Sequence, residues 1–276
     1  MKECNMKLSI ITVNLNNKDG LRKTAQSIVS QSFKDFEWIV IDGGSTDGSN
    51  EIIEQYSKYI TYWVSEPDKG IYNAMNKGIV VARGYYLLFL NSGDVLYSQA
   101  TLSEVFKLNI EVDILTGQVE RMDNHQLLRN YESNLFIQLY KDTINHQGTF
   151  IKKELFNHRK YDEDLRLVSD WKFWIESIIG DNASVMVTNL IISKQDMNGV
   201  SSNISLLSQE RKEVFNKLFP ALLQNEINDL IKIKDSDYYQ KIIFLKKNCI
   251  HYYNFVFRFA RFWIRIYNLT HRKHSL

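Results

Sequence analysis

Polar side chains follow four apolar runs of this sequence, at the points where the runs end. They belong to Asn14 and Asn16, to Asp42, to Glu66 and Asp68, and to Ser92 and Asp94. Mg²⁺ in proteins takes oxygen ligands, and one or two carboxylates suffice when phosphate oxygens and water complete its shell. The set therefore suits a nucleotide diphosphate held with a divalent ion, with Asp94 as the metal-binding carboxylate.

Short motifs typical of several other chemistries are missing from the sequence. It has no GxGxxG after the first apolar run and no GxxxxGK[ST], which argues against a dinucleotide fingerprint and a P-loop. It has no HExxH, no Cys-His pattern typical of zinc and no GxSxG nucleophile turn. The stretch DGGSTDG lacks the carboxylate spacing of a calcium loop.

The apolar runs alternate with amphipathic segments, and this alternation predicts an α/β fold. Strands are expected at 8–16, 36–45, 61–66 and 85–94, and helices between them at 20–33, 49–59 and 69–82. Such βαβ units form a mostly parallel sheet, and ligands bind beyond the carboxyl ends of its strands. The polar side chains named above would then meet at one edge of the sheet.

After residue 100 the pattern is less regular. Helices are expected at 98–108, 135–143, within 162–179 and over 203–235, and strands at 112–122 and 183–195, with a strand leading into a helix over 146–156.

The composition favours an ordinary globular protein of 276 residues, 44% hydrophobic and 24% charged. Cys4 and Cys249 lie far apart and fit no metal spacing, so we expect reduced thiols. The first apolar run is too short for a signal peptide, and no run is long enough to cross a bilayer. These features predict a cytoplasmic protein.

The net charge of +2 is unevenly distributed along the chain. The segment 241–276 has eight Lys and Arg and no Asp or Glu, so it carries +8 and residues 1–240 carry −6. In YNFVFRFARFWIRIYNLTHRK, arginines form one stripe of a predicted helix and aromatic residues cover the rest. This pattern is typical of a helix in the headgroup region of an anionic membrane. We predict that residues 241–273 bind such a surface, with packing on the protein core as the alternative and nucleic-acid binding disfavoured.

Four stretches between residues 8 and 97 carry a family resemblance: SIITVNLNN, QSFKDFEWIVIDGGSTDGS, SEPDKGIYNAMNKGIVVARG and YYLLFLNSGDVLY. They resemble, in order and spacing, the N-terminal half of family 2 glycosyltransferases of the GT-A fold. The resemblance implies inverting transfer of a sugar from a nucleotide-sugar donor, with Mn²⁺ or Mg²⁺, to a hydroxyl of a glycan or lipid-linked glycan. Surface polysaccharide assembly is the setting it implies. It also implies a GT-A domain over 1–200, with a donor half at 1–97 and an acceptor half at 98–200, before a helical extension at 201–276.

By position, the resemblance implies roles for residues of the donor half. They are Thr12 and Asn14 beside the nucleobase and ribose, Asp42 after the second strand, Asp68 and Asn76 at the border of the nucleotide site, Ser92 beside the sugar, and Asp94 at the metal. Ser92 stands where the family has the first Asp of its DxD motif. Gly43 stands where the family often has a second carboxylate that can meet a uracil ring.

The implied reaction also needs a base, because the acceptor hydroxyl must lose its proton as it attacks the anomeric carbon. The family places a carboxylate for this at the start of a later helix, and in LRLVSDWKFW the candidate is Asp170. The alternative for Asp170 is an acid that stabilises the first turn of that helix. His146, whose His-Gln pair resembles a family motif, and Trp171 are expected on the acceptor side, with a structural histidine as the alternative.

Two other functions remain open on the sequence. A GT-A domain without catalytic activity would bind a glycan or scaffold an assembly at the membrane. A nucleotidyltransferase would attack phosphorus instead of the anomeric carbon. The products separate these functions, because sugar transfer releases a nucleoside diphosphate and nucleotidyl transfer releases pyrophosphate.

Overall fold

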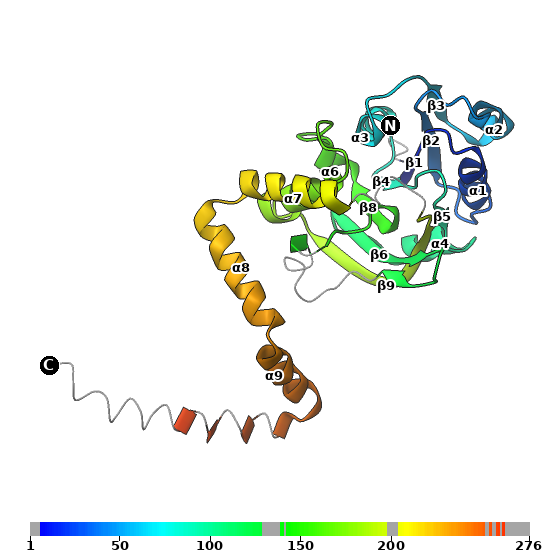
Figure 1. Ribbon diagram of the computed structural model, residues 1–276. Coiled ribbons are helices and arrows are strands. Elements are labelled where there is room, and N and C mark those ends of the chain that lie inside the picture. Colours follow the sequence, from blue (N-terminus) through cyan, green and yellow to red (C-terminus); the bar gives the residue numbers. More distant parts are fainter. Residues whose placement is uncertain are drawn as a thin grey trace, which may run out of the picture. The chain divides into compact units, whose positions relative to one another are not determined.

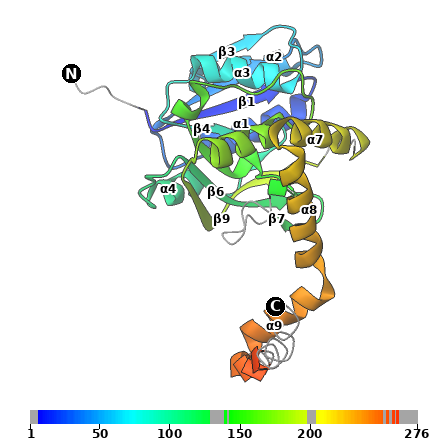
Figure 2. The same cartoon turned by 90° about the vertical axis from the view of Figure 1, so that its left-hand side faces the viewer.

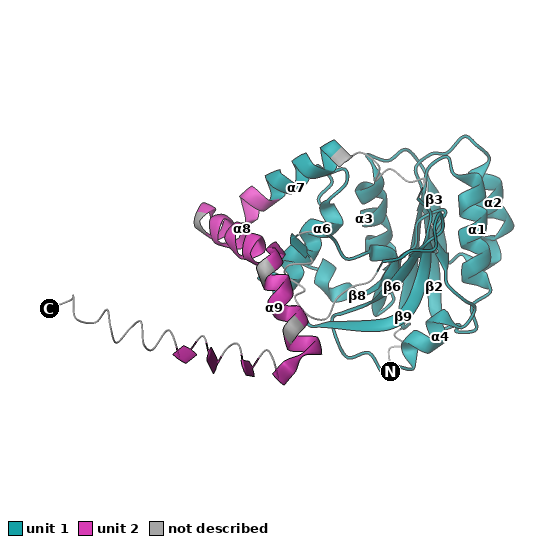
Figure 3. Cartoon of the chain, turned by 60° about the horizontal axis from the view of Figure 1, so that its bottom comes forward, with its two compact units in different colours: residues 1–214 teal, residues 215–276 magenta. Residues whose placement is uncertain are grey.

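The computed structural model describes residues 6–128, 139–140, 142–197 and 204–251, and the pairs 254–255, 258–259 and 261–262. The chain divides into two units, Met1–Val214 and Phe215–Leu276 (Figure 3). Helix α7 (Ile204–Leu218) begins inside the first unit.

Four parallel strands form the first half of the central sheet, as the sequence predicts. They are β1 (Leu8–Asn14), β2 (Phe36–Asp42), β3 (Tyr62–Ser65) and β4 (Tyr86–Phe89), in the spatial order β3-β2-β1-β4. Asn14 pairs in register with Asp42, and Asp42 with Ser65, so the polar residues at these strand ends stand side by side. The expected edge of polar side chains is therefore present.

Helices cover both faces of this half-sheet (Figure 3). Leu8 and Ile10 of β1 pack in the cluster that includes α1 (Lys18–Val29) and α2 (Ser49–Gln55). Ile11 and Val13 pack in the other cluster, with α3 (Ile71–Val81). Successive side chains of a strand point to opposite faces, so a strand covered on both faces is apolar throughout. This explains why β4, which is buried along its whole length, is apolar throughout.

The second half of the sheet is mixed, which the sequence pattern did not predict. It contains β5 (Val95–Leu96), β6 (Ile114–Arg121), β7 (Leu127–Leu128), β8 (Thr149–Lys152) and β9 (Val185–Gln195). Strand β8 inserts between β4 and β6 and runs antiparallel to both, whereas β6 and β9 lie side by side and parallel (Figure 1, Figure 2). The sheet order is β3-β2-β1-β4-β8-β6-β9-β5, with β7 paired to β6.

The helices of the second half are shorter than expected. Helix α4 (Thr101–Phe106) lies within the predicted 98–108. Helix α6 (Ser169–Trp174) continues into a wider turn at Ile175–Gly180, within the predicted 162–179. The segment 153–156, expected to start a helix, is a short 3₁₀ turn, and the helix expected at 135–143 lies largely outside the described residues.

The second unit is helical over its described residues. Helix α8 (Ala221–Asp235) starts at Pro220, which ends α7 because proline has no N–H for the helical ladder. Helix α9 (Asp237–Asn248) follows. Among the described residues, none of the helices is both long enough and apolar enough to span a bilayer.

Candidate active site

The loop 91–94 after β4 carries Asp94, and helix α1 holds this loop in place. The hydroxyl of Thr24 accepts a hydrogen bond from the N–H of Gly93 at 3.0 Å and donates one to the carbonyl of Asp94 at 2.7 Å. Gly93 has φ +105°, a conformation that a residue with a side chain rarely adopts. Asn17 Nδ2 donates to the carbonyl of Ser92 at 3.0 Å. These contacts hold the backbone of residues 92–94 against α1 and the residue that precedes it.

The carboxyl group of Asp94 is buried, and burial changes its acidity. Burial raises its pKa from 3.8 to about 7, although the N–H of Asp196 and the nearby His146 act in the opposite direction. One oxygen, Oδ1, accepts from the N–H of Asp196 at 2.9 Å. A bound cation would favour the charged form of such a carboxyl group. Within the described ranges, no three His, Cys, Asp or Glu side chains gather as a complete metal site, so phosphate oxygens and water would have to supply further ligands.

Asp42, at the end of β2, is a buried anchor for neighbouring loops. Its carboxylate accepts hydrogen bonds from Asn14 Nδ2 at 2.6 Å, Ser65 Oγ at 2.7 Å, and both the N–H and Oγ of Ser45 at 2.8 and 2.6 Å. Burial raises the pKa of Asp42, but the bonds from Ser45, Ser65 and Asn14 outweigh burial and lower the net pKa below 3.8. The carboxylate of Asp42 therefore binds groups of the protein itself and links the ends of β1, β2 and β3.

The other residues expected around the nucleobase differ in position. Thr12 is fully buried, and its hydroxyl accepts a hydrogen bond from the indole N–H of Trp38 at 3.0 Å. Thr12 is therefore not brought to the strand edge with the rest. Asp68 is brought there, because its Oδ2 lies 2.5 Å from the point where a Cβ on Gly43 would stand. A Cβ at position 43 would require the carboxylate of Asp68 to shift, so Asp68 occupies the space beside Gly43.

Asn76 connects α3 to the segment before α6. Its Nδ2 donates to the carbonyl of Tyr161 and to Glu163 Oε1, both at 2.8 Å. Its Oδ1 accepts from the N–H of Tyr161 at 3.0 Å. Asn76 thus acts as a brace between α3 and the segment of Tyr161 and Glu163.

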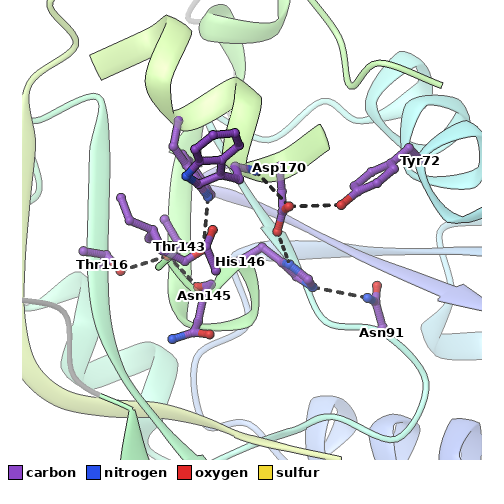
Figure 4. Close-up of polar contacts among 11 residues, drawn as sticks. Tyr72, Asn91, Thr116, Thr143, Asn145, His146 and Asp170 are labelled. Atoms are coloured by element: carbon purple, nitrogen blue, oxygen red, sulfur yellow. Dashed lines mark hydrogen bonds and ion pairs between the residues drawn. The ribbon is translucent and has the colours of Figure 1, made fainter. Parts of the chain in front are cut away.

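Asp170 lies in the first turn of α6, buried between groups from distant parts of the chain (Figure 4). Its Oδ1 accepts from the hydroxyl of Tyr72 at 3.0 Å and from the N–H of Trp171 at 2.8 Å. Its Oδ2 contacts His146 Nδ1 at 3.1 Å. The N–H contact within the turn is compatible with the first-turn role, but the two side-chain contacts join Asp170 to α3 and to the 3₁₀ turn His146–Gly148.

His146 connects Asp170 to the loop of Asp94 (Figure 4). Its Nε2 lies 3.3 Å from Asn91 Nδ2 and its Nδ1 lies 3.1 Å from Asp170 Oδ2, so the ring bridges the two side chains. Burial lowers the pKa of His146, but the adjacent carboxylate of Asp170 outweighs burial and raises the net pKa. The base candidate and the metal candidate are therefore linked through one imidazole and Asn91.

Trp171 is buried, and it packs inside the protein. Its indole N–H donates to the carbonyl of Leu139, and the guanidinium of Arg211 lies 5.0 Å from the centre of its ring. These contacts give Trp171 a packing role beneath Asp170.

Two residues of this region were not singled out from the sequence. Tyr72 lies in the quoted stretch GIYNAMN, one helical turn from Asn76, and that spacing puts both on one face of a helix. Glu210 of α7 is buried and accepts from the N–H groups of Arg166 and Leu167 at 2.8 and 2.9 Å. No sequence pattern marks Glu210, because its partners are backbone groups of a distant loop.

Solved structures share the fold of this chain. The chain aligns with residues 1–349 of Staphylococcus aureus TarS, crystallised with UDP, at a TM-score of 0.57 and 20% identity over 70% of this chain and 61% of that chain. It aligns with the mannosyltransferase PcManGT of Pyrobaculum calidifontis, in complex with GDP-Man and Mn²⁺, at 0.54 and 15% identity over 69% and 57%. Each match leaves more than a third of the crystallised chain without a counterpart. The likeness shows the GT-A fold.

Sequence comparison gives the same result. A "PGL/p-HBAD biosynthesis glycosyltransferase" of Mycobacterium bovis (strain BCG / Pasteur 1173P2) is 30% identical over 205 residues, 71% of this chain and 79% of the relative. An uncharacterized glycosyltransferase of Mycobacterium tuberculosis is 44% identical over 88 residues, 32% of this chain and 34% of that one. The family model "Glycosyl transferase family 2" matches residues 9–162. This enzyme therefore belongs to glycosyl transferase family 2.

Proposed function

We propose that this enzyme moves a sugar from a nucleotide-diphosphate sugar to a hydroxyl of a glycan or lipid-linked glycan, with inversion, in cell-surface polysaccharide biosynthesis. The observation that carries the proposal is the contact of His146 with both Asp170 and Asn91, at 3.1 and 3.3 Å. It holds a candidate base close to the loop of a candidate metal ligand. The UDP and GDP-Man complexes of structural relatives support a nucleotide-sugar donor.

The geometry suits a single displacement. Asp170 would take the proton of the acceptor hydroxyl while the acceptor oxygen attacks the anomeric carbon from the face opposite the leaving diphosphate. One displacement inverts the configuration at that carbon. His146 holds the carboxylate of Asp170 from one side, and its own orientation is fixed by Asn91. The base is thereby oriented before the substrate binds, which lowers the barrier that reorientation would add.

Mn²⁺ or Mg²⁺ fits the buried Asp94, because a carboxyl group with a pKa of about 7 gains charge stabilisation from a cation. When bound, the ion would supply positive charge to the departing diphosphate. Asp94 would hold it, and the loop of Ser92 and Gly93 would bring the backbone close to the phosphates. Asp42 and Asn14 would support the nucleotide site without touching the nucleotide, since Asn14 Nδ2 binds the carboxylate of Asp42.

The proposal is tested by the substitution Asp170→Asn, which keeps the size of the side chain but removes the base. We expect sugar transfer to fall by about 10²- to 10⁴-fold, the usual contribution of a general base. The donor dissociation constant, measured by calorimetry, should stay unchanged. Asp164→Asn is the matched control, because Asp164 is an exposed acid of the segment that precedes α6, and it should transfer at the wild-type rate. Wild-type turnover of Asp170→Asn would remove Asp170 as the base.

A donor screen tests the reaction class. The enzyme is incubated with nucleotide sugars, an acceptor glycan and Mn²⁺ or Mg²⁺, and the released nucleotide is identified. A nucleoside diphosphate supports the proposal, whereas pyrophosphate would indicate nucleotidyl transfer and contradict it.

We further propose that residues 241–273 attach the enzyme to the inner, anionic face of the cell membrane. Helix α9 ends in Lys246 and Lys247, and large apolar side chains near them are exposed. Phe255, Phe259 and Phe262 have exposed fractions of 63%, 56% and 57%. Exposed aromatic rings next to lysines and arginines favour membrane binding over packing on a core. Residues 263–273 lie outside the described part of the chain.

Vesicle sedimentation tests this attachment. Lys246→Glu together with Lys247→Glu should weaken binding to vesicles of phosphatidylglycerol and phosphatidylcholine by at least about tenfold, because each basic residue near such a surface contributes about 1 kcal/mol. Lys232→Glu, an exposed residue of α8, is the control and should bind nearly as the wild type does. Equal binding of the double variant would contradict the proposal.

A further inference from the structure

We infer that Tyr72 is a positioning residue that determines which oxygen of Asp170 takes the proton, an inference that rests on the proposed function. The hydroxyl of Tyr72 donates to Asp170 Oδ1 at 3.0 Å, and the N–H of Trp171 donates to the same oxygen at 2.8 Å. A carboxylate oxygen has two lone pairs, so Oδ1 is fully occupied. Across the described residues, Oδ2 has one partner, His146 Nδ1 at 3.1 Å. The remaining lone pair on Oδ2 is therefore the one available to the acceptor hydroxyl.

The phenol of Tyr72 is suited to donate at all working pH values. Tyr72 is buried, and burial together with the adjacent Asp170 raises its pKa well above 10. The hydroxyl of Tyr72 therefore stays protonated and uncharged. Its ring packs against that of Tyr161, with the centres 5.5 Å apart, in the aromatic group that surrounds Phe173 of α6. Close packing of these aromatic rings restricts the ring of Tyr72, so its hydroxyl has a fixed direction.

Helix α3 connects the donor-side loop at Asp68 to the candidate base Asp170 through Tyr72. The helix starts directly after Gly70, whose N–H binds Asp68 Oδ1 at 2.8 Å at the strand edge. One turn further on, Asn76 binds both backbone groups of Tyr161. Helix α3 thus contacts the donor-side loop at its start. Further along, it contacts Asp170 and the segment that precedes α6. Tyr72 and Asp170 are 98 residues apart in the chain and meet only through this packing.

In the resulting step, the acceptor hydroxyl gives its proton to Asp170 Oδ2. The acceptor oxygen forms the new bond to the anomeric carbon, and the bond from that carbon to the diphosphate breaks. The diphosphate leaves with the electron pair, and Asp170 later returns its proton to water. Tyr72 neither gains nor loses a proton; it keeps Oδ1 occupied and the carboxylate plane in place.

The substitution Tyr72→Phe tests the inference, with Tyr161→Phe as the matched control. Both remove one hydroxyl from the same buried aromatic group. The hydroxyl of Tyr161 has no hydrogen-bond partner in the described structure, so its loss should leave kcat unchanged. A hydrogen bond to a charged group is strong enough that Tyr72→Phe should lower kcat by about 10- to 100-fold. The donor dissociation constant and the acceptor KM should stay within about twofold, because Tyr72 acts through Asp170 and not on the substrates.

A double-mutant cycle separates this positioning role from a loss of structure. In the Asp170→Asn background, Tyr72→Phe should lower kcat no further, because the group that it positions is gone. All rates are referred to active sites counted by donor binding. Full activity of Tyr72→Phe, or an equal loss in the Asp170→Asn background, would overturn the inference while leaving the base assignment intact. Full activity of Asp170→Asn alone would instead overturn the proposed function.

Discussion

Replacing Asn76 by alanine separates two roles for this side chain, a ligand of the nucleotide and a brace within the protein. The family resemblance implies the first role. The structure shows three hydrogen bonds that link α3 to Tyr161 and Glu163, at 2.8, 3.0 and 2.8 Å. Asn76 and Tyr161 are both buried, so water does not replace these bonds when the side chain is removed.

The expected loss of stability follows from the groups left behind. Asn76→Ala leaves the N–H and the carbonyl of Tyr161 buried without these partners, and each such group costs about 1–3 kcal/mol. Glu163 adds less, because it keeps the bond from Asn73 Nδ2 at 2.7 Å. We therefore expect the free energy of unfolding to fall by about 2–5 kcal/mol, a large share of the total of about 5–15 kcal/mol for a typical domain.

The assay is urea unfolding followed by circular dichroism, combined with donor binding at low temperature where the variant is folded. Asn73→Ala is the control, because Asn73 binds the same Glu163 from a more exposed position, and it should cost at most about 1 kcal/mol. The donor dissociation constant of Asn76→Ala should match that of the wild type. A tenfold or larger loss of donor affinity with unchanged stability would refute the brace and restore the nucleotide role.

Three further predictions concern Asp113, Thr12 and Asp94. The hydrogen bond from Ser184, with help from Lys152, lowers the pKa of Asp113 from 3.8 to about 2. The contribution of Asp113 to stability is therefore complete above pH 3.8 and is lost as the pH falls through about 2. Asp113→Asn should lower the free energy of unfolding at pH 7 by about 1 kcal/mol after solvent screening, and wild-type stability at pH 7 would contradict this. Thr12→Val leaves the buried indole N–H of Trp38 unpaired, so it should lower the free energy of unfolding by about 1–3 kcal/mol and leave donor affinity unchanged. Weaker donor binding at wild-type stability would instead assign Thr12 to the nucleotide site. Asp94→Asn should abolish the difference in nucleotide affinity between Mn²⁺ and chelator, measured by calorimetry, and a persisting difference would exclude Asp94 as the metal ligand.

Much of the fold could be predicted from local patterns. The alternation of apolar runs with amphipathic segments predicted the four parallel strands and the three helices between them, because each of these elements buries a continuous surface of its own. The meeting of Asn14 and Asp42 followed from the same pattern, since parallel strands end at a shared edge. The mixed half of the sheet could not be predicted in this way. The position of β8 between β4 and β6 depends on how distant segments pair, and the sequence around Thr149–Lys152 does not encode its neighbours locally.

The sequence by itself determined which residue types stand near the strand ends and at the start of α6. Only the tertiary structure decided what each of them contacts. Thr12 and Asn76 lie in stretches that resemble family motifs, yet Thr12 binds Trp38 and Asn76 binds Tyr161. Conversely, the link from Tyr72 to Asp170 spans 98 residues, and the link from Asp170 to Asn91 passes through His146. The physical reason is that a hydrogen bond requires two groups within about 3 Å in a definite direction, and that condition depends on helix rotation and packing that no local pattern contains.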